Sequence, residues 1–362
     1  MKIFYFFSVL IISISFKTYA QCNGSELLCS KKYNEVSYLT THNAYNSTED
    51  SFFLPNQNYS IKTQLKAGVR ALMVDVYDDN GLAIVCHGFK EFGAITFNEI
   101  LSDIKTFLDL NPNEIVTLIL ESYVTVNQIK SCLNELNLFG YLYAHQIGED
   151  WPVLQELIDC NTRLIIFSDV DDTDDELSGY HYLWDHAIET HYANSTTSDL
   201  SCNFNRGKFN NDLFILNHFL NDSLLGTGFP EETEFMNTNP FFMNRVLECM
   251  YESNKFPNFI TVDFFELGES LAVVNKINGV SENNPTSDYL IYPNPLIDRV
   301  IIRSDKAIKR DELTIFNTLG QDCTETIEFK NLSENMSLDL SRLSMGAYFL
   351  SIGKKNYTLI KR

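Results

Sequence analysis

Residues 68–88 read GVRALMVDVYDDNGLAIVCHG, and this stretch guides the interpretation of the whole chain. It holds two β-rich apolar runs, Arg70–Tyr77 and Leu82–His87, which end in polar and titratable groups. Most such runs in the chain are continuously apolar, as expected for strands buried on both faces. Six further strand-like runs lie at Val36–His42, Ile115–Glu121, Leu164–Ser168, Ala187–Tyr192, Leu213–Phe219 and Asn258–Phe264.

Helical stretches separate several of these runs. Examples are Ala94–Leu110, Val126–Leu138 and Trp151–Asp159. Eight strands that alternate with helices over roughly 250 residues are typical of a TIM (β/α)8-like barrel. The sequence therefore predicts an α/β fold of this class.

Polar residues stand at the carboxyl ends of four predicted strands. Asp75, His87 and Glu121 lie at or next to such ends, and His42-Asn43 closes the first strand. In (β/α)8 barrels the catalytic residues gather at this edge. Because four separate segments place polar residues at this edge, we expect the functional site at the carboxyl ends of the barrel strands.

The two histidines suit acid–base chemistry, since the pKa of imidazole lies near neutrality. We expect His42 to act as a general base and His87 as a general acid in phosphodiester cleavage. The carboxylates of Asp75 and Glu121 would repel a phosphate unless a cation lies between them. With the carboxamide of Asn43 they form a hard donor set that suits Ca²⁺ or Mg²⁺.

The N-terminus has the pattern of a secretion signal at 1–20. Lys2 precedes an apolar run from Ile3 to Phe16, which Lys17 closes and which is too short for a comfortable membrane span. The eight cysteines then favour disulfides. Connectivity is not readable from sequence, but three pairs are candidates that would leave Cys86 and Cys323 free: Cys22 with Cys29, Cys202 with Cys249, and Cys132 with Cys160.

Charge divides the chain. Residues 21–288 carry 14 Lys/Arg against 39 Asp/Glu, a net charge of −25, whereas residues 289–362 carry 11 against 9, a net charge of +2. The acidic part argues against nucleic acid and against adsorption to anionic membranes. We expect a barrel at 21–279, a linker at 280–288 that is rich in Asn and Ser, and a small β-sandwich at 289–362.

The barrel segments resemble the X-region of phosphatidylinositol-specific phospholipases C, most closely its secreted, plant-type members. The matching stretches are Thr41–Tyr45, Gly68–Tyr77 with Cys86-His87, Asn111–Tyr123, Asp150–Phe167 and Phe256–Phe265. The resemblance implies a distorted TIM barrel that uses two histidines to form and open a cyclic inositol phosphate.

By this resemblance, His42 and His87 are the catalytic pair. Asn43, Asp75 and Glu121 match positions that hold Ca²⁺ in the metal-dependent branch of the family. Met73 stands where that branch has a further glutamate ligand. Two more residues join the predicted catalytic set: Asp263, which matches a carboxylate that orients the base, and Arg70, which follows a Gly-x-Arg pattern.

The end of the chain resembles the C-terminal sorting domain of type IX secretion cargo. The matching residues are Tyr292–Pro295, Gly320-Gln321, Leu343–Leu350 and Lys361-Arg362. This implies that the secretion machinery is a partner and that the protein is exported through the outer membrane.

Other interpretations remain open. The barrel suits a glycerophosphodiester phosphodiesterase, although that family has His-Arg-Gly and Glu-x-Asp where this chain has His42-Asn43-Ala44 and Met73-Val74-Asp75. A secreted module that binds a phosphorylated or glycosylated ligand without turnover is the non-enzymatic alternative. His191 and His218 are expected to be structural or pocket-lining, and residues 169–176 an acidic loop rather than a calcium loop.

Overall fold

The computed structural model describes residues 21–171, 177–222, 227–280, 289–292, 296, 298–303, 308–332, 335–353 and 355–361. The predicted signal peptide at 1–20 lies outside these residues. So do 281–288 of the predicted linker and 172–176 of the acidic loop.

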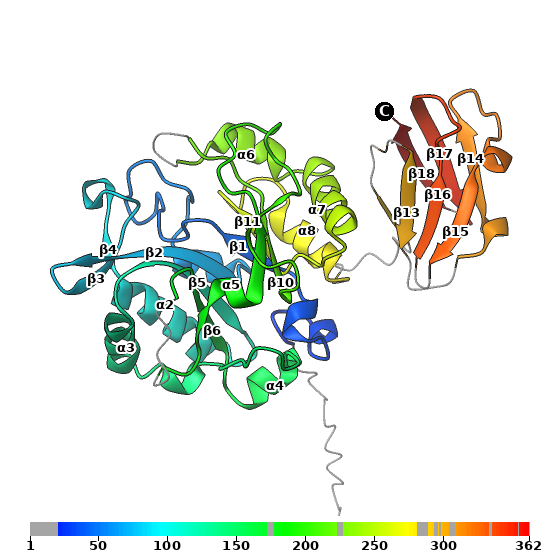
Figure 1. The fold of residues 1–362 in the computed structure, drawn as a ribbon. Coiled ribbons are helices and arrows are strands. Elements are labelled where there is room, and N and C mark those ends of the chain that lie inside the picture. The colour runs from blue at the N-terminus through cyan, green and yellow to red at the C-terminus, as the bar shows by residue number, and fades with distance from the viewer. Residues whose placement is uncertain are drawn as a thin grey trace, which may run out of the picture.

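The first body is built on a curled sheet of eight parallel strands in the order β7-β6-β5-β2-β1-β11-β10-β8 (Figure 1). When only these eight parallel strands are counted, neighbours in the sheet mostly follow one another along the chain, as in a (β/α)8 barrel. The predicted TIM-like fold is thus confirmed. The strands are β1 (Tyr38–Thr41), β2 (Ala71–Asp79), β5 (Val116–Tyr123), β6 (Leu164–Ser168), β7 (Tyr180–Tyr182), β8 (Ala187–Thr190), β10 (Leu213–Asn217) and β11 (Phe259–Val262).

The barrel is open on one side. Within the described residues, no pairing joins β7 to β8, which a short helix, α5 (Leu183–His186), connects. Three short antiparallel strands extend the sheet: β3 (Leu82–Val85) pairs with β2, β4 (Ile95–Thr96) with β3, and β9 (Phe204–Gly207) with β8.

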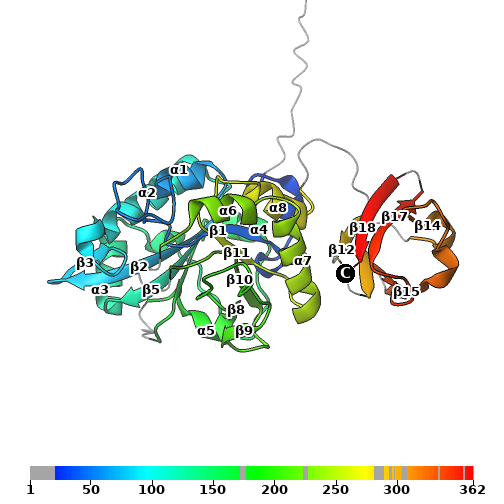
Figure 2. The ribbon, with the colours of Figure 1, turned by 90° about the horizontal axis from the view of Figure 1, so that it is seen from above.

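Seven of the eight predicted strand runs are barrel strands, and one prediction was wrong. Leu82–His87 does not enter the barrel, because β3 turns back along β2 as a hairpin that extends outward from the body (Figure 2). The remaining barrel strand, β7, was missed. It has only three residues, Tyr180-His181-Tyr182, and therefore lacks the apolar run by which the others were found.

Helices pack outside the sheet. In α2 the buried residues include Phe97, Leu101, Ile104 and Leu108, whose spacing gives one apolar face. A capping box of Thr96 and Glu99 sets its start. The helices are α1 (Ile61–Lys66), α2 (Phe97–Leu110), α3 (Val126–Glu135), α4 (Leu154–Asp159), α6 (Pro230–Met236), α7 (Phe241–Ser253) and α8 (Ser270–Ile277), with short 3-10 helices at Glu26–Leu28, Tyr33–Glu35, Lys90–Phe92 and Phe139–Tyr141. None of the helices in the described residues is long and apolar enough to cross a bilayer.

Two of the candidate disulfides form. Cys22 bonds Cys29, and Cys202 bonds Cys249. The third candidate pair is wrong, since Cys132 and Cys160 are both free thiols, as are Cys86 and Cys323.

The C-terminal part forms two antiparallel sheets around a core of its own, which includes Val300, Ile315 and Leu350. This is the predicted small β-sandwich. One sheet has the order β12-β13-β16-β15 and the other β14-β17-β18. Their strands are β12 (Leu290–Tyr292), β13 (Arg299–Arg303), β14 (Leu313–Asn317), β15 (Glu328–Leu332), β16 (Asn335–Asp339), β17 (Gly346–Ile352) and β18 (Lys355–Lys361), with 3-10 helices at Arg310–Glu312 and Thr324–Thr326.

Candidate active site

The register of two parallel strands places His42 beside Asp263. Strands β1 and β11 pair with Thr41 opposite Val262, so the next residue of each strand lies at the same edge of the sheet. The backbone N–H of His42 continues the ladder by donating to the carbonyl of Val262 at 3.0 Å. As a result, His42 Nδ1 lies 2.9 Å from Asp263 Oδ1.

Further contacts fix both side chains. Asp263 is fully buried, and Asn56 Nδ2 donates to its Oδ2 at 3.2 Å. Burial raises the pKa of Asp263, while His42 and the hydrogen bonds act in the opposite direction. The imidazole of His42 stacks on Phe219 with 3.8 Å between ring centroids. The ring therefore has little freedom to turn.

A hairpin returns His87 to the same edge. Strand β2 continues past Asp75 to Asp79, and Asn80 and Gly81 then reverse the chain with φ of 56° and 91°. Strand β3 runs back with Val85 opposite Val76, which brings the following residues Cys86 and His87 toward Asp75. Asn-Gly between two strands is a strong hairpin signal. That signal in the sequence, applied to 79–82, would have revealed this turn.

Asp75 and Glu121 are direct neighbours in register on β2 and β5. Tyr45 donates its hydroxyl to Asp75 Oδ2 at 2.9 Å, and Tyr123 donates to Glu121 Oε1. Burial, together with the charge of Glu121, raises the pKa of Asp75 to about 7. Two neighbouring carboxylates on paired strands repel each other, and a bound cation would offset this repulsion.

These residues share one cavity of about 530 Å³, called here the site cavity. Five of the seven predicted site residues line it, and Asp263 lies behind His42. The wall also contains residues that were not among the predicted site residues. The predicted residues are His42, Asn43, Asp75, His87 and Glu121; the others include Met73, Tyr77, Tyr123, Asp169, Trp184, Glu189, Tyr192, Arg206 and Phe219.

Arg206 is the one Lys or Arg side chain among the described residues that line the site cavity. Its guanidinium lies between the rings of Trp184 and Tyr192, at 4.5 and 4.6 Å from their centroids. Its Nε donates to Glu189 Oε1 at 2.5 Å. Nothing in the sequence pattern marked Arg206, because it lies on the short edge strand β9.

Arg70 lies at the other end of the barrel, so the prediction that groups it with the catalytic residues was wrong. It precedes β2, where its Nε donates to Glu114 Oε2 at 2.7 Å and its Nη1 donates to the carbonyls of Leu65 and Val69. Amino ends of parallel strands meet opposite the edge that carries the site. Arg70 thus connects the start of β2 with the end of α1 and with the segment before β5.

The other two histidines near strand ends do not line the site cavity. His191 is exposed, and its Nδ1 accepts from the N–H of Ala193. His218 is fully buried against Phe242, and its pKa is lowered to about 3 chiefly by burial. Cys86 is buried, and its carbonyl accepts from the hydroxyl of Tyr45.

The barrel region matches the family model described as PI-PLC X 1 over residues 28–278. The chain belongs to the PI-PLC X family. A PI-PLC X domain-containing protein 1 of Arthroderma benhamiae is 27% identical over 281 residues, covering 72% of this chain and 90% of that protein. A PI-PLC X domain-containing protein of Arabidopsis thaliana is 28% identical over 275 residues, covering 68% of this chain and 62% of that protein.

Among solved structures, the phosphatidylinositol-specific phospholipase C of Listeria monocytogenes has a TM-score of 0.47 at 18% identity. That alignment covers 70% of this PI-PLC X protein and 96% of the Listeria chain.

The tail of this PI-PLC X protein matches a secretion system C-terminal sorting domain over residues 290–362. The predicted type IX sorting domain is therefore confirmed, and with it export to the cell surface or the medium.

Proposed function

We propose that this protein cleaves a phosphodiester in the manner of a phosphatidylinositol-type phospholipase C. The observation that carries the proposal is that His42 and His87 line one cavity while Asp263 holds Nδ1 of His42. Two imidazoles that face one volume can serve the attacking and the leaving oxygen in a single displacement.

His42 is proposed as the base. With Nδ1–H donated to the carboxylate of Asp263, the lone pair of Nε2 is left to accept a proton. A hydroxyl of the substrate head group attacks phosphorus and gives its proton to Nε2. Asp263 then stabilises the imidazolium that forms.

His87 is proposed as the acid. Burial and the neighbouring His42 lower its pKa to about 4 in the substrate-free cavity. An anionic phosphodiester beside the ring favours the protonated form and raises that pKa. As the new P–O bond forms and the bond to the leaving alcohol breaks, His87 gives its proton to the leaving oxygen. The product is a cyclic phosphodiester, which water opens with the roles of the histidines reversed.

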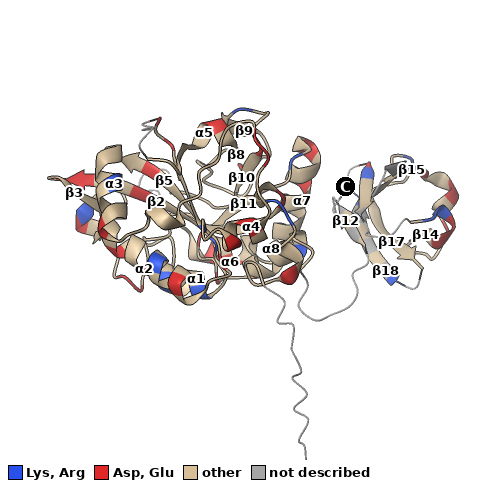
Figure 3. Cartoon of the chain, turned by 90° about the horizontal axis from the view of Figure 1, so that it is seen from below, with Lys and Arg blue, Asp and Glu red and all other residues tan. Residues whose placement is uncertain are grey.

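A cation fits this acidic cavity. Asp75, Glu121, Asp169 and Glu189 line it, against Arg206 as the single Lys or Arg among the described residues of its wall. Acidic residues, coloured red, recur along the ribbon of the barrel (Figure 3). Asp75, Glu121 and Asn43 Oδ1 would hold Ca²⁺, since Asn43 Nδ2 is already directed at Asn56 Oδ1. Bound there, the ion would polarise a phosphoryl oxygen.

The donor set is small. Met73 supplies no oxygen, and no group of three or more His, Cys, Asp or Glu suited to a metal occurs in the described parts of the chain. The proposed ion therefore depends on Asn43 and on water for its remaining ligands, which favours weak binding.

The test is chromatography of the products from phosphatidylinositol, with and without chelator. A cyclic inositol phosphate that disappears on chelation supports the cation-assisted reaction. Glycerol phosphate released instead from glycerophosphoinositol indicates a glycerophosphodiester phosphodiesterase. Tight ligand binding with no product from either diester contradicts the enzyme and favours a binding module.

A further inference from the structure

Three buried asparagines connect the proposed base His42 to a proposed cation ligand. Asn43 is that ligand and lines the site cavity, while Asn46 and Asn56 do not line it. Asn56 is completely buried, and its side chain contacts both other amides and the carboxylate of Asp263. We call Asn43, Asn46 and Asn56 the asparagine network.

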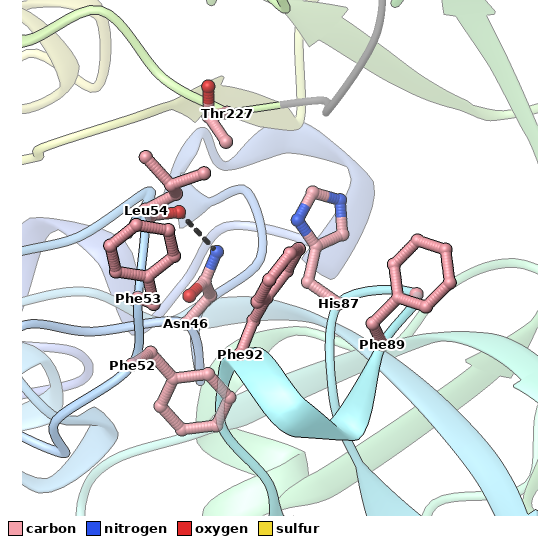
Figure 4. A pocket seen from close by; sticks show the side chains of 9 residues that line it. Asn46, Phe52, Phe53, Leu54, His87, Phe89, Phe92 and Thr227 are labelled. Atoms are coloured by element: carbon pink, nitrogen blue, oxygen red, sulfur yellow. Dashed lines mark hydrogen bonds between the residues drawn. The ribbon is translucent and has the colours of Figure 1, made fainter.

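The carbonyl of Leu54 fixes the direction of the first amide. Asn46 Nδ2 lies 3.2 Å from this carbonyl oxygen, the dashed line in Figure 4, and 2.7 Å from Asn56 Oδ1. A backbone carbonyl can only accept a hydrogen bond. The NH₂ group of Asn46 must therefore face Leu54, and its second hydrogen is donated to Asn56. A reversed amide would place Asn46 Oδ1 against the carbonyl oxygen of Leu54.

Asn56 passes this direction on to the base. Its Oδ1 accepts from Asn46 Nδ2 and, at 3.2 Å, from Asn43 Nδ2. Because this end of the amide is the acceptor, the other end is the donor, and Nδ2 donates to Asp263 Oδ2 at 3.2 Å. Asp263 Oδ1 accepts from His42 Nδ1. Two donors favour the ionised carboxylate, which holds the proton of the neutral imidazole on Nδ1.

Asn43 receives its direction from the same amide. Since Asn43 Nδ2 donates to Asn56 Oδ1, Asn43 Oδ1 is turned away from Asn56 and stays available to another partner. Asn43 and Asp75 line the same site cavity. A carboxamide oxygen is a ligand for Ca²⁺, whereas the NH₂ group of a reversed amide offers no lone pair.

The backbone around the asparagine network is strained. Asn43, Leu54 and Phe264 have φ of 44°, 58° and 39°. This conformation is unfavourable for Leu and Phe and persists only where surrounding contacts impose it. The main chain of Asn56 supplies two such contacts, because its N–H donates to the carbonyl of Asn46 and its carbonyl accepts from the N–H of Phe264, both at 2.9 Å. Strained backbone of this kind clusters at functional sites.

We propose that Asn56 is a positioning residue that directs the base His42 and the cation ligand Asn43 together, in a direction set by the carbonyl of Leu54 through Asn46. The inference rests on the proposed function, which assigns those two roles. Asn56 acts through its neighbours, because it keeps Nε2 of His42 and Oδ1 of Asn43 available at the same time.

Asn46→Asp tests the direction of the network in the full-length protein. Aspartate has nearly the shape of asparagine, but its carboxylate only accepts hydrogen bonds. Asn56 should then turn its NH₂ group toward residue 46 and present Oδ1 to Asp263, and Asn43 should turn its NH₂ group into the site cavity. We expect about tenfold weaker Ca²⁺ binding by calorimetry. The added negative charge alone would instead strengthen binding.

Nitrogen-15 NMR of the histidine rings in the metal-free protein measures the effect on the base. At a pH where the ring is neutral, wild-type His42 should carry its proton on Nδ1, and in Asn46→Asp the ring should become a mixture of both tautomers. Asn56→Leu should change the ring and the Ca²⁺ affinity in the same way, since it removes the donor and the acceptor. A wild-type ring with its proton on Nε2 would overturn the inference without any variant.

Asn258→Asp is the matched control. Asn258 is also completely buried and lies just before β11, at the amino ends of the barrel strands. It donates to the carbonyls of Asn34 and Val36 and accepts from the N–H of Phe214. The control variant therefore adds the same charge and disturbs a comparable set of hydrogen bonds away from the site cavity. It should lose stability yet keep the wild-type Kd for Ca²⁺ and the wild-type tautomer of His42.

An unchanged Kd and an unchanged ring spectrum in Asn46→Asp and Asn56→Leu would overturn the inference, as would tighter Ca²⁺ binding by Asn46→Asp or a change in only one of the two measurements. Equal changes in the control variant would mean that lost packing is the cause, and the inference fails. A wild type that shows the expected tautomer and affinity changes on substitution but cleaves no diester supports the asparagine network and contradicts the proposed function. Turnover in the wild type with neither change in the variants does the reverse.

Discussion

His42 Nδ1 and Asp263 Oδ1 lie 2.9 Å apart although 221 residues separate them in the chain. The parallel pairing of β1 with β11 produces this contact, and the complete burial of Asp263 strengthens it. Hydrogen bonds to an ionised partner are shorter and stronger than neutral ones. The pair sets which nitrogen of His42 faces the site cavity, and the first prediction follows from it.

Asp263→Asn should leave the fold intact and reduce turnover by roughly 10²–10⁴-fold, because an amide no longer holds Nδ1–H of His42 in the required tautomer. Nitrogen-15 NMR of the histidine rings would detect the change of tautomer alongside the loss of kcat. Unaltered turnover together with an altered ring spectrum would remove Asp263 from the mechanism.

His42→Ala and His87→Ala should each lower phosphodiester cleavage by about 10²–10⁴-fold or more in folded protein, since each removes one proton-transfer group. His191→Ala is the matched control, because that exposed histidine also follows a barrel strand but does not line the site cavity. Near-normal kcat in either of the first two variants would contradict the proposed roles.

Met73→Glu should tighten Ca²⁺ binding, since it adds a carboxylate to the wall that already holds Asp75 and Glu121. We expect roughly a tenfold lower Kd by calorimetry, and Asp75→Asn should weaken binding by a similar factor. If neither variant changes the affinity for Ca²⁺, the ion does not bind at these residues.

Acid should destabilise the barrel through buried histidines at its open side. Burial lowers the pKa of His181 and of His186 to about 4 from 6.5. The unfolded chain then binds more protons than the folded chain between these values, so the free energy of unfolding falls as pH drops from about 6.5 toward 4. The slope should approach roughly 1 kcal/mol per pH unit for each histidine.

Urea unfolding across this pH range checks the acid effect, with His186→Phe as the informative variant. Phenylalanine cannot bind a proton, so the slope should become shallower in this variant. An unchanged slope would mean that other groups account for the acid sensitivity.

Arg70→Ala should cost about 2–4 kcal/mol of stability, because it leaves Glu114 without its partner in a largely buried pair. Since Arg70 lies at the barrel end away from the site cavity, kcat should stay near the wild-type value at temperatures where the variant is folded. Chemical denaturation and turnover measured on the same sample distinguish the two effects. A selective loss of kcat would return Arg70 to the catalytic set.

Most of the barrel could be predicted because its strands are buried on both faces. A run such as Leu164–Ser168 is apolar throughout, and its bounds agree with β6. Two elements did not follow that rule. Strand β7 is short and carries His181, whose buried ring contacts the rings of Phe167 and His186. Strand β3 has the composition of a barrel strand but pairs as a hairpin.

The sequence by itself determined the fold class, the export tail and the residue types of the site. Buried strands appear in it as apolar runs, and the motifs of the site and of the tail are contiguous in the chain. Only the tertiary structure decided which of those residues meet. It separated Arg70 from the site, and it brought in Tyr45, Asn56 and Arg206, whose partners Asp75, Asp263 and Glu189 lie in other segments of the chain. The physical reason is strand register: a contact between distant segments depends on how the strands pair, and residue order does not specify this.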